Sequence, residues 1–86
     1  MQKYTQQEIE NLITLYNSTD KLVIKENTQR ILSNSTLKIV DIAEGSGVGV
    51  QTLYQYNKDY VTNYPNFSTA LKLANFLKID ITDFIK

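Results

Sequence analysis

Apolar residues along the chain recur at helical spacing, in stretches that are separated by turn-forming residues. In the first stretch, Thr5 and Glu8 have the spacing of a capping box, which starts a helix. The apolar positions that follow are spaced i, i+3, i+4 and i+7, which places them on one helical face: Ile9, Leu12, Ile13 and Tyr16. The pattern predicts a helix over residues 6–16. This helix either packs on the core and enlarges it or acts as a dimerisation arm.

A polar segment at residues 17–20 then separates this helix from a second one that starts near Lys21. Apolar residues of the second helix cluster at its two ends: Leu22, Val23, Ile24, Ile31 and Leu32. The positions between them are polar: Lys25, Glu26, Asn27 and Gln29. Residues 33–36 should stop this helix, and either Ser35 or Thr36 is expected to cap the next one. We expect Leu37 to join the core.

Residues 39–58 form the stretch around which the chain is organised, and they predict two helices joined by a tight turn. Ile39, Ile42 and Ala43 line one face of the first helix, which we expect to break at Gly45 and Gly47. Ala43 supplies a small residue where the helices approach, and Gly47 accepts a positive φ. The residues expected to point inward after the turn are Val48, Val50, Leu53 and Tyr56, with Val48 and Leu53 filling the angle between the helices. The positions assigned to the outer side are Gly49, Val50, Gln51, Thr52, Tyr54, Gln55 and Lys58.

The closing part of the chain predicts one longer helix and one short helix. Tyr60, Val61 and Tyr64 precede it, and these side chains either pack their apolar edges on the core or donate to phosphates. Pro65 suits the first turn of a helix, where a missing N–H costs little. The stripe that we expect to be buried is Phe67, Ala70, Leu71, Ala74 and Leu77. Asp80 is expected to cap a last short helix, with Asp83 in its first turn and Phe84 and Ile85 behind it.

These patterns predict an all-α chain of five helices, or six if residues 58–64 contain a turn, with no sheet. Its 86 residues suffice for one domain. The chain has no cysteine and no histidine, which removes disulfides, thiolate zinc sites and histidine-based catalysis. No paired carboxylates, phosphate loop or activated nucleophile occurs, so we expect neither an enzyme nor a cofactor or metal. Without a membrane-spanning run, a signal peptide or a small-molecule motif, the sequence predicts a cytoplasmic protein.

The spacing in two segments resembles the helix-turn-helix domains of phage repressors, Cro proteins and XRE-type regulators. That family places a small residue, a glycine four residues later and an apolar residue six beyond, as Ala43, Gly47 and Leu53 do here. Its closing segment resembles PNFSTALKLANFLKIDITDFI, with matches at Pro65, Leu71, Leu73, Ala74, Leu77, Ile79, Ile81 and Phe84. The resemblance implies a five-helix lambda-repressor-like domain over residues 21–86, with an additional N-terminal helix and turn over residues 1–20 in one compact unit. A TetR-like opening domain has a similar motif, but the closing segment argues against it.

The resemblance implies a transcriptional regulator that reads a palindromic operator in double-stranded DNA as a homodimer, with its recognition helix at about residues 50–58. The expected base contacts are Val50, Gln51 and Gln55, since glutamine pairs with adenine and valine touches a thymine methyl. The expected phosphate contacts are Lys38, Gly49, Thr52, Tyr54 and Lys58. Nine basic residues balance nine acidic ones, whereas DNA-binding proteins usually have a basic surplus. The alternative is therefore a protein-interaction module, such as an antirepressor, that keeps the fold without binding DNA.

Overall fold

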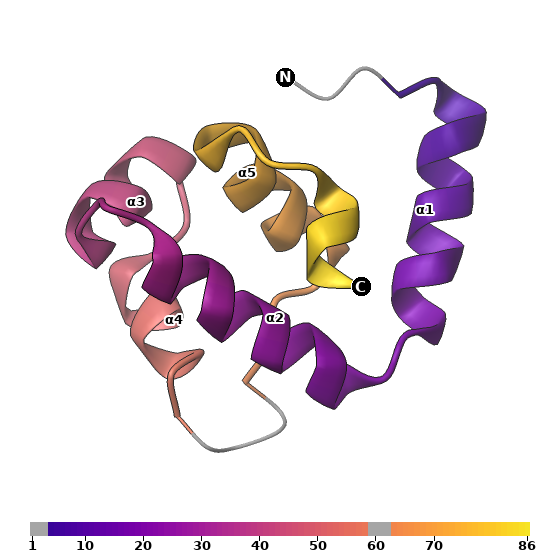
Figure 1. Cartoon of the computed structure of the whole chain (residues 1–86). Helices are drawn as coiled ribbons and strands as arrows, with labels where there is room; N and C mark the ends of the chain where they lie inside the picture. Colours follow the sequence, from indigo (N-terminus) through magenta and orange to yellow (C-terminus); the bar gives the residue numbers. More distant parts are fainter. Residues whose placement is uncertain (1–3, 59–62) are drawn as a thin grey trace.

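All regular structure in the described part of the chain, residues 4–58 and 63–86, is helical in the computed structural model (Figure 1). No strand occurs within these ranges, so the predicted all-α class is confirmed there. The elements are α1 (Gln6–Ser18), α2 (Lys21–Asn34), α3 (Ile39–Ser46), α4 (Val50–Gln55), α5 (Phe67–Leu77) and the short 3-10 helix η1 (Ile81–Phe84). Tyr60, Val61 and the suggested extra turn lie outside the described residues.

The helices surround one core to which each of them contributes. Helix α3 packs against both α4 and α5, while η1 packs against α2 and α5. Helix α1 stands along one side of the molecule and contacts α5 (Figure 1). The apolar side chains of the core are Tyr16, Ile24, Leu32, Ile42, Val48, Leu53, Tyr56, Ala70, Leu73, Ala74, Ile81 and Phe84. Within the described residues, no helix has the length and apolar character needed to cross a membrane.

The capping pattern predicted for α1 is present in the structure. The Glu8 backbone N–H donates to the Thr5 hydroxyl at 3.2 Å, and the Thr5 N–H donates to the Glu8 carboxylate at 2.9 Å. The helix continues two residues beyond the predicted end. Tyr16 is buried and its ring meets Phe67 edge-on, with centroids 5.6 Å apart, so α1 does pack on the core. Ile13, which lies on the predicted apolar face of this helix, is 37% exposed.

Helix α2 differs most from its predicted burial pattern. Its start is confirmed, because the Asp20 side chain accepts the Leu22 backbone N–H at 2.8 Å. Leu22 itself is exposed, whereas the polar residues Lys25, Asn27 and Thr28 in the middle of the helix are buried. The Asn27 amide donates to the backbone carbonyls of Phe84 and Lys86, both at 3.0 Å. Buried polar groups are tolerated here because each donates to a backbone carbonyl, Lys25 and Asn27 to other segments and Thr28 to Ile24 of the same helix.

The predictions for the start of α3 are wrong. Neither Ser35 nor Thr36 caps it, because the N-cap is Lys38 and no side-chain bond caps the helix. The Ser35 hydroxyl instead accepts the Leu37 N–H at 3.1 Å, within the turn that leaves α2. Leu37 does not join the core either, since it is 43% exposed.

Gly45 does not break α3, which continues through it to Ser46. The structure shows a role for this glycine that the sequence pattern did not reveal. A Cβ atom built there would lie 2.0 Å from Cε1 of Phe76, so the absence of a side chain lets α3 approach the Phe76 ring of α5 closely. Gly45 is thus a small residue at the contact between α3 and α5, and Ala43, which was predicted at the contact between α3 and α4, is half-buried against the core.

The closing helices follow the prediction with two changes. Helix α5 starts at Phe67 with Asn66 as its N-cap, so Pro65 lies before the helix and outside its first turn. Leu73 is fully buried in place of the half-buried Leu71 and Leu77 of the predicted stripe. Asp80 caps η1 as predicted, by accepting the Thr82 N–H at 2.9 Å.

Candidate functional site on α3 and α4

The turn between α3 and α4 is closed by bonds that its own residues make. Gly47 has φ 81° and ψ 9°, in the left-handed region, and its N–H donates to the Ala43 carbonyl at 3.0 Å. The Ser46 hydroxyl donates to the Ile42 carbonyl at 2.6 Å and accepts the Val48 N–H at 3.2 Å. Glycine adopts this backbone conformation without the steric cost that a Cβ would bring. The prediction of a positive φ at Gly47 is confirmed.

Three side chains that follow the turn anchor α4 to the core. Val48 and Tyr56 are almost fully buried and Leu53 is completely buried. Leu53 lies within the six-residue helix Val50–Gln55, Val48 precedes that helix, and Tyr56 is its C-cap residue. Because a helix this short is marginal by itself, its orientation depends on these tertiary contacts. The predicted inward positions Val48, Leu53 and Tyr56 are confirmed, while Val50 is half-buried and belongs only in part to the outer side.

The remaining residues of the predicted outer face are exposed. They are Gly49, Gln51, Thr52, Tyr54, Gln55 and Lys58. Gln51 and Gln55 are four residues apart on α4, so their side chains leave the helix on the same side. Neither carboxamide has a hydrogen-bond partner among residues 4–58 and 63–86. Both amides therefore have their donors and acceptor available to a partner.

A buried lysine, which the sequence analysis left among the polar positions of α2, holds the end of α4. Lys25 is only 4% exposed, and its Nζ donates to the backbone carbonyls of Tyr56 at 3.2 Å, of Lys58, and of Asn63 at 3.4 Å. Gln29 donates to the Tyr56 carbonyl as well, at 3.0 Å. A cation is favourable at a helix C-terminus, where carbonyls lack partners and the helix dipole is negative. No local pattern signals the contacts of Lys25, since its partners lie more than 30 positions away.

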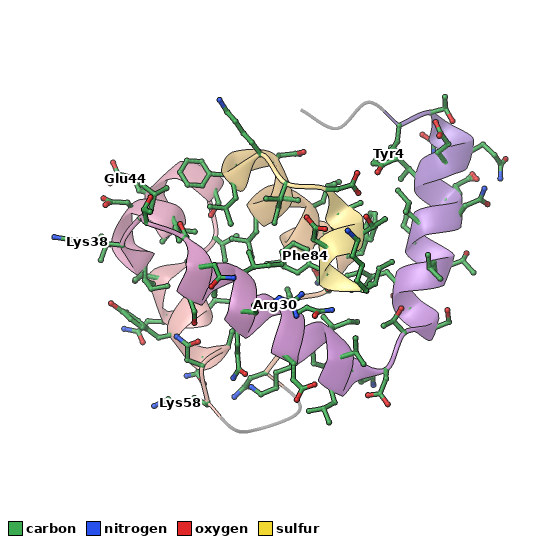
Figure 2. The ribbon with its side chains drawn as sticks, in the orientation of Figure 1. Tyr4, Arg30, Lys38, Glu44, Lys58 and Phe84 are labelled. Carbon is green, nitrogen blue, oxygen red and sulfur yellow. The ribbon has the colours of Figure 1, made fainter. Side chains whose placement is uncertain are left out.

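The charged side chains around this surface have mixed signs. Lys38 precedes α3 and Lys58 follows α4, and both extend away from the body of the molecule (Figure 2). Asp41 and Glu44 on α3 are also exposed, so two carboxylates lie on the same helix pair as the two lysines. Arg30 lies on α2 and lines a different part of the surface. The local charge around α3 and α4 is therefore close to balanced.

The chemistry available on this surface is that of hydrogen bonding. No group of three or more Asp, Glu, His or Cys side chains in the described ranges is placed to hold a metal ion. Burial raises the pKa of the Tyr56 hydroxyl above its usual value, so this group stays protonated at neutral pH. The exposed groups are carboxamides, hydroxyls, ammonium groups and the two carboxylates of α3, which are suited to binding another molecule.

Comparisons of this chain with protein-family models, with curated proteins and with solved structures found no match. The functional interpretation therefore depends on the residues of α3 and α4 themselves.

Proposed function

We propose that this protein is a sequence-specific DNA-binding transcriptional regulator of the phage-repressor type. In this proposal α3 and α4 form a helix-turn-helix motif, and α4 is the recognition helix. The observation that carries the proposal is the exposed pair Gln51 and Gln55, one helical turn apart on a helix whose opposite side is fixed by Leu53. A rigid helix with free carboxamides on one side is suited to reading the edges of bases in a major groove.

Direct reading of bases is assigned to three side chains of α4. Gln51 and Gln55 would each pair with an adenine through the amide donor and the carbonyl acceptor. Val50, which is half-buried, would touch a thymine methyl group with the part of its side chain that remains exposed.

Contacts to the phosphate backbone are assigned to residues at both ends of the motif. Lys38 and Lys58 supply positive charge, and both are exposed. Gly49, Thr52 and Tyr54 would contribute a backbone N–H and two hydroxyl groups, and Tyr54 is 46% exposed. Such contacts position a protein on DNA without reading its sequence.

A homodimer is part of this proposal, because one α4 of six residues covers only one half-site of an operator. Self-association through the C-terminal apolar residues is disfavoured, since Phe84 is fully buried. Helix α1 offers an alternative surface, because Ile13 is 37% and Leu15 is 51% exposed. Analytical ultracentrifugation at high micromolar concentration, with and without DNA, tests this point, and a strict monomer in both conditions would contradict it.

A protein-interaction module of the antirepressor kind is the second candidate. Asp41 and Glu44 favour it, because exposed carboxylates on α3 repel the phosphates that Lys38 and Lys58 would attract. The zero net charge of the chain favours it as well.

Gel-shift titrations over a range of salt concentrations, with DNA from around its own gene, distinguish the two candidates. For the regulator, replacing Gln51 or Gln55 by alanine should cost about 1–3 kcal/mol at the cognate site and relax the preference at one base pair. Replacing Lys38 or Lys58 by alanine should weaken binding to all sequences and lower the salt slope by about one unit per lost phosphate contact.

Matched controls come from exposed residues on other helices. Gln6→Ala on α1 and Lys72→Ala on α5 should leave affinity, base preference and salt slope unchanged. If the folded wild-type protein shifts no DNA at low salt, or if both kinds of substitution on α3 and α4 leave affinity unchanged, the regulator is excluded and the interaction module takes its place.

A further inference from the structure

An open cavity of about 700 Å³ lies where the end of α2, the segment before α3, the end of α5 and η1 meet. Its size is within the range of cavities that bind small organic molecules. Apolar side chains from α2, from the segment before α3 and from the end of α5 form much of its lining: Ile31, Leu37, Phe76, Leu77 and Ile79. Leu37 is exposed although it is apolar, and its side chain forms part of the cavity lining.

The charged residues of the lining are mostly basic. Arg30, Lys78 and Lys86 contribute three positive charges, and Asp83 contributes one negative charge. Asp83 is already paired, because its Oδ1 lies 2.8 Å from Nζ of Lys86. Arg30 and Lys78 have no acidic partner among residues 4–58 and 63–86. The cavity therefore combines an apolar wall with an excess of positive charge.

Two of these cations lie close enough to affect each other. The Lys86 ammonium donates a hydrogen bond to the Asp83 carboxylate, which raises the pKa of Lys86 above its usual value, and the charge of Arg30 acts in the opposite direction. Arg30 lies on α2, which packs against η1 (Figure 2). A bound anion would give Arg30 and Lys78 the acidic partner that they lack among the described residues.

We propose that this cavity binds a small amphipathic organic anion, with its apolar part against Leu37 and Ile79 and its charged group at Arg30 and Lys78. The lining comes from two stretches that are distant in sequence, residues 30–37 and 76–86, so no single contiguous motif announces the site. None of its lining residues belongs to α4. The proposal is therefore independent of DNA binding, and either can fail without the other.

Titration of the whole chain with ten-carbon probes below their micelle concentrations, followed by amide NMR shifts, tests the proposal. Decanoate and decyl phosphate carry an anionic group, decanol is neutral, and decyltrimethylammonium is cationic. The two anions should bind most tightly and shift the amides of lining residues such as Ile31, Leu37 and Ile79. The difference between decanoate and decyl phosphate tells which anionic group is preferred. Equal binding of the cationic probe, or shifts that avoid the lining residues, would overturn the proposal.

Two substitutions separate the charge from the apolar wall. Arg30→Gln should weaken binding of the anions about two- to fivefold and leave decanol unchanged, because an exposed ion pair contributes modestly. Leu37→Ser should weaken the anions and decanol alike. Lys72→Gln, an exposed lysine of α5 outside the cavity, is the control and should change nothing. If Arg30→Gln keeps its melting temperature and binds decanoate as the wild type does, the site is not electrostatic and the proposal fails.

Discussion

The hydroxyl of Tyr16 donates a 2.6 Å hydrogen bond to the backbone carbonyl of Pro65, across 49 positions of the sequence. Both residues are buried, and the bond joins α1 to the segment that leads into α5. Burial, and then the neighbouring Tyr56 and Tyr64, raise the pKa of the Tyr16 hydroxyl far above its usual value. The hydroxyl therefore remains a donor throughout the neutral and mildly alkaline range, and α1 is tied to the core by a specific polar contact.

Removing this hydroxyl should destabilise the protein. Tyr16→Phe keeps the ring that contacts Phe67 but leaves the buried Pro65 carbonyl without its donor, which should lower the free energy of unfolding by about 1–2 kcal/mol. Urea denaturation followed by circular dichroism measures the difference. Tyr54→Phe is the control. Because Tyr54 is exposed, this variant should unfold as the wild type does. An unchanged midpoint for Tyr16→Phe would mean that α1 is held by its apolar contacts alone.

The left-handed conformation of Gly47 predicts a cost for any branched side chain at that position. Gly47→Val should lower the free energy of unfolding by about 1–2 kcal/mol and reduce the melting temperature. The cost is conformational, because a Cβ at Gly47 would meet no atom within 4 Å. Gly49→Ala is the matched control, since Gly49 has φ −59° and a Cβ there would meet only the Thr52 hydroxyl at 3.5 Å. Equal stability of Gly47→Val and the wild type would show that this turn adopts another conformation.

Removing the buried ammonium group of Lys25 should lower the stability of the protein. Lys25→Met preserves much of the aliphatic stem but removes the donor that the Lys58 and Asn63 carbonyls share, which should cost about 1–3 kcal/mol. Thermal unfolding measures the loss, and amide hydrogen exchange should increase most at the end of α4. Lys72→Met, on the exposed surface of α5, should show neither change. Faster exchange spread evenly over all helices would instead indicate a general loss of packing.

The hydrogen bonds of Asp80 predict that the stability of the protein falls at acid pH. The Thr82 backbone N–H, and then the Tyr4 hydroxyl, bond to this carboxylate and lower its pKa below 3.8. Because the folded state binds the proton more weakly than the unfolded state, the contribution is present above pH 3.8 and is lost as pH falls through the folded pKa. Denaturant midpoints measured between pH 2 and pH 6 should therefore fall less steeply for Asp80→Asn than for the wild type. Parallel curves would show that this carboxylate is not coupled to folding.

Local patterns predicted the helices well where the deciding interactions lie within a few residues. The capping box of Thr5 and Glu8, the N-cap at Asp20, the positive φ at Gly47 and the cap at Asp80 each involve atoms two to four positions apart. The burial of Leu53 and Ala70 followed from helical spacing in the same way.

The failures share a different cause, since each depends on atoms from a distant part of the chain. Leu37 was expected to be buried by its apolar character, but no other element covers it fully. Gly45 was expected to end α3, yet the helix continues, and the ring of Phe76 approaches at this glycine. Periodicity assigns a residue to a face and does not reveal what lies against that face.

The sequence by itself determined where α1, α2 and η1 begin, the left-handed conformation of Gly47 and which polar residues of α4 face outward, because short-range hydrogen bonds and helical periodicity fix these features. Only the tertiary structure decided that Lys25 would be buried against the end of α4, that α1 would be bonded to Pro65, and that Arg30 and Leu37 would line one cavity. These arrangements require packing between segments up to about 50 residues apart. The contacts that stabilise this packing form only when the chain folds.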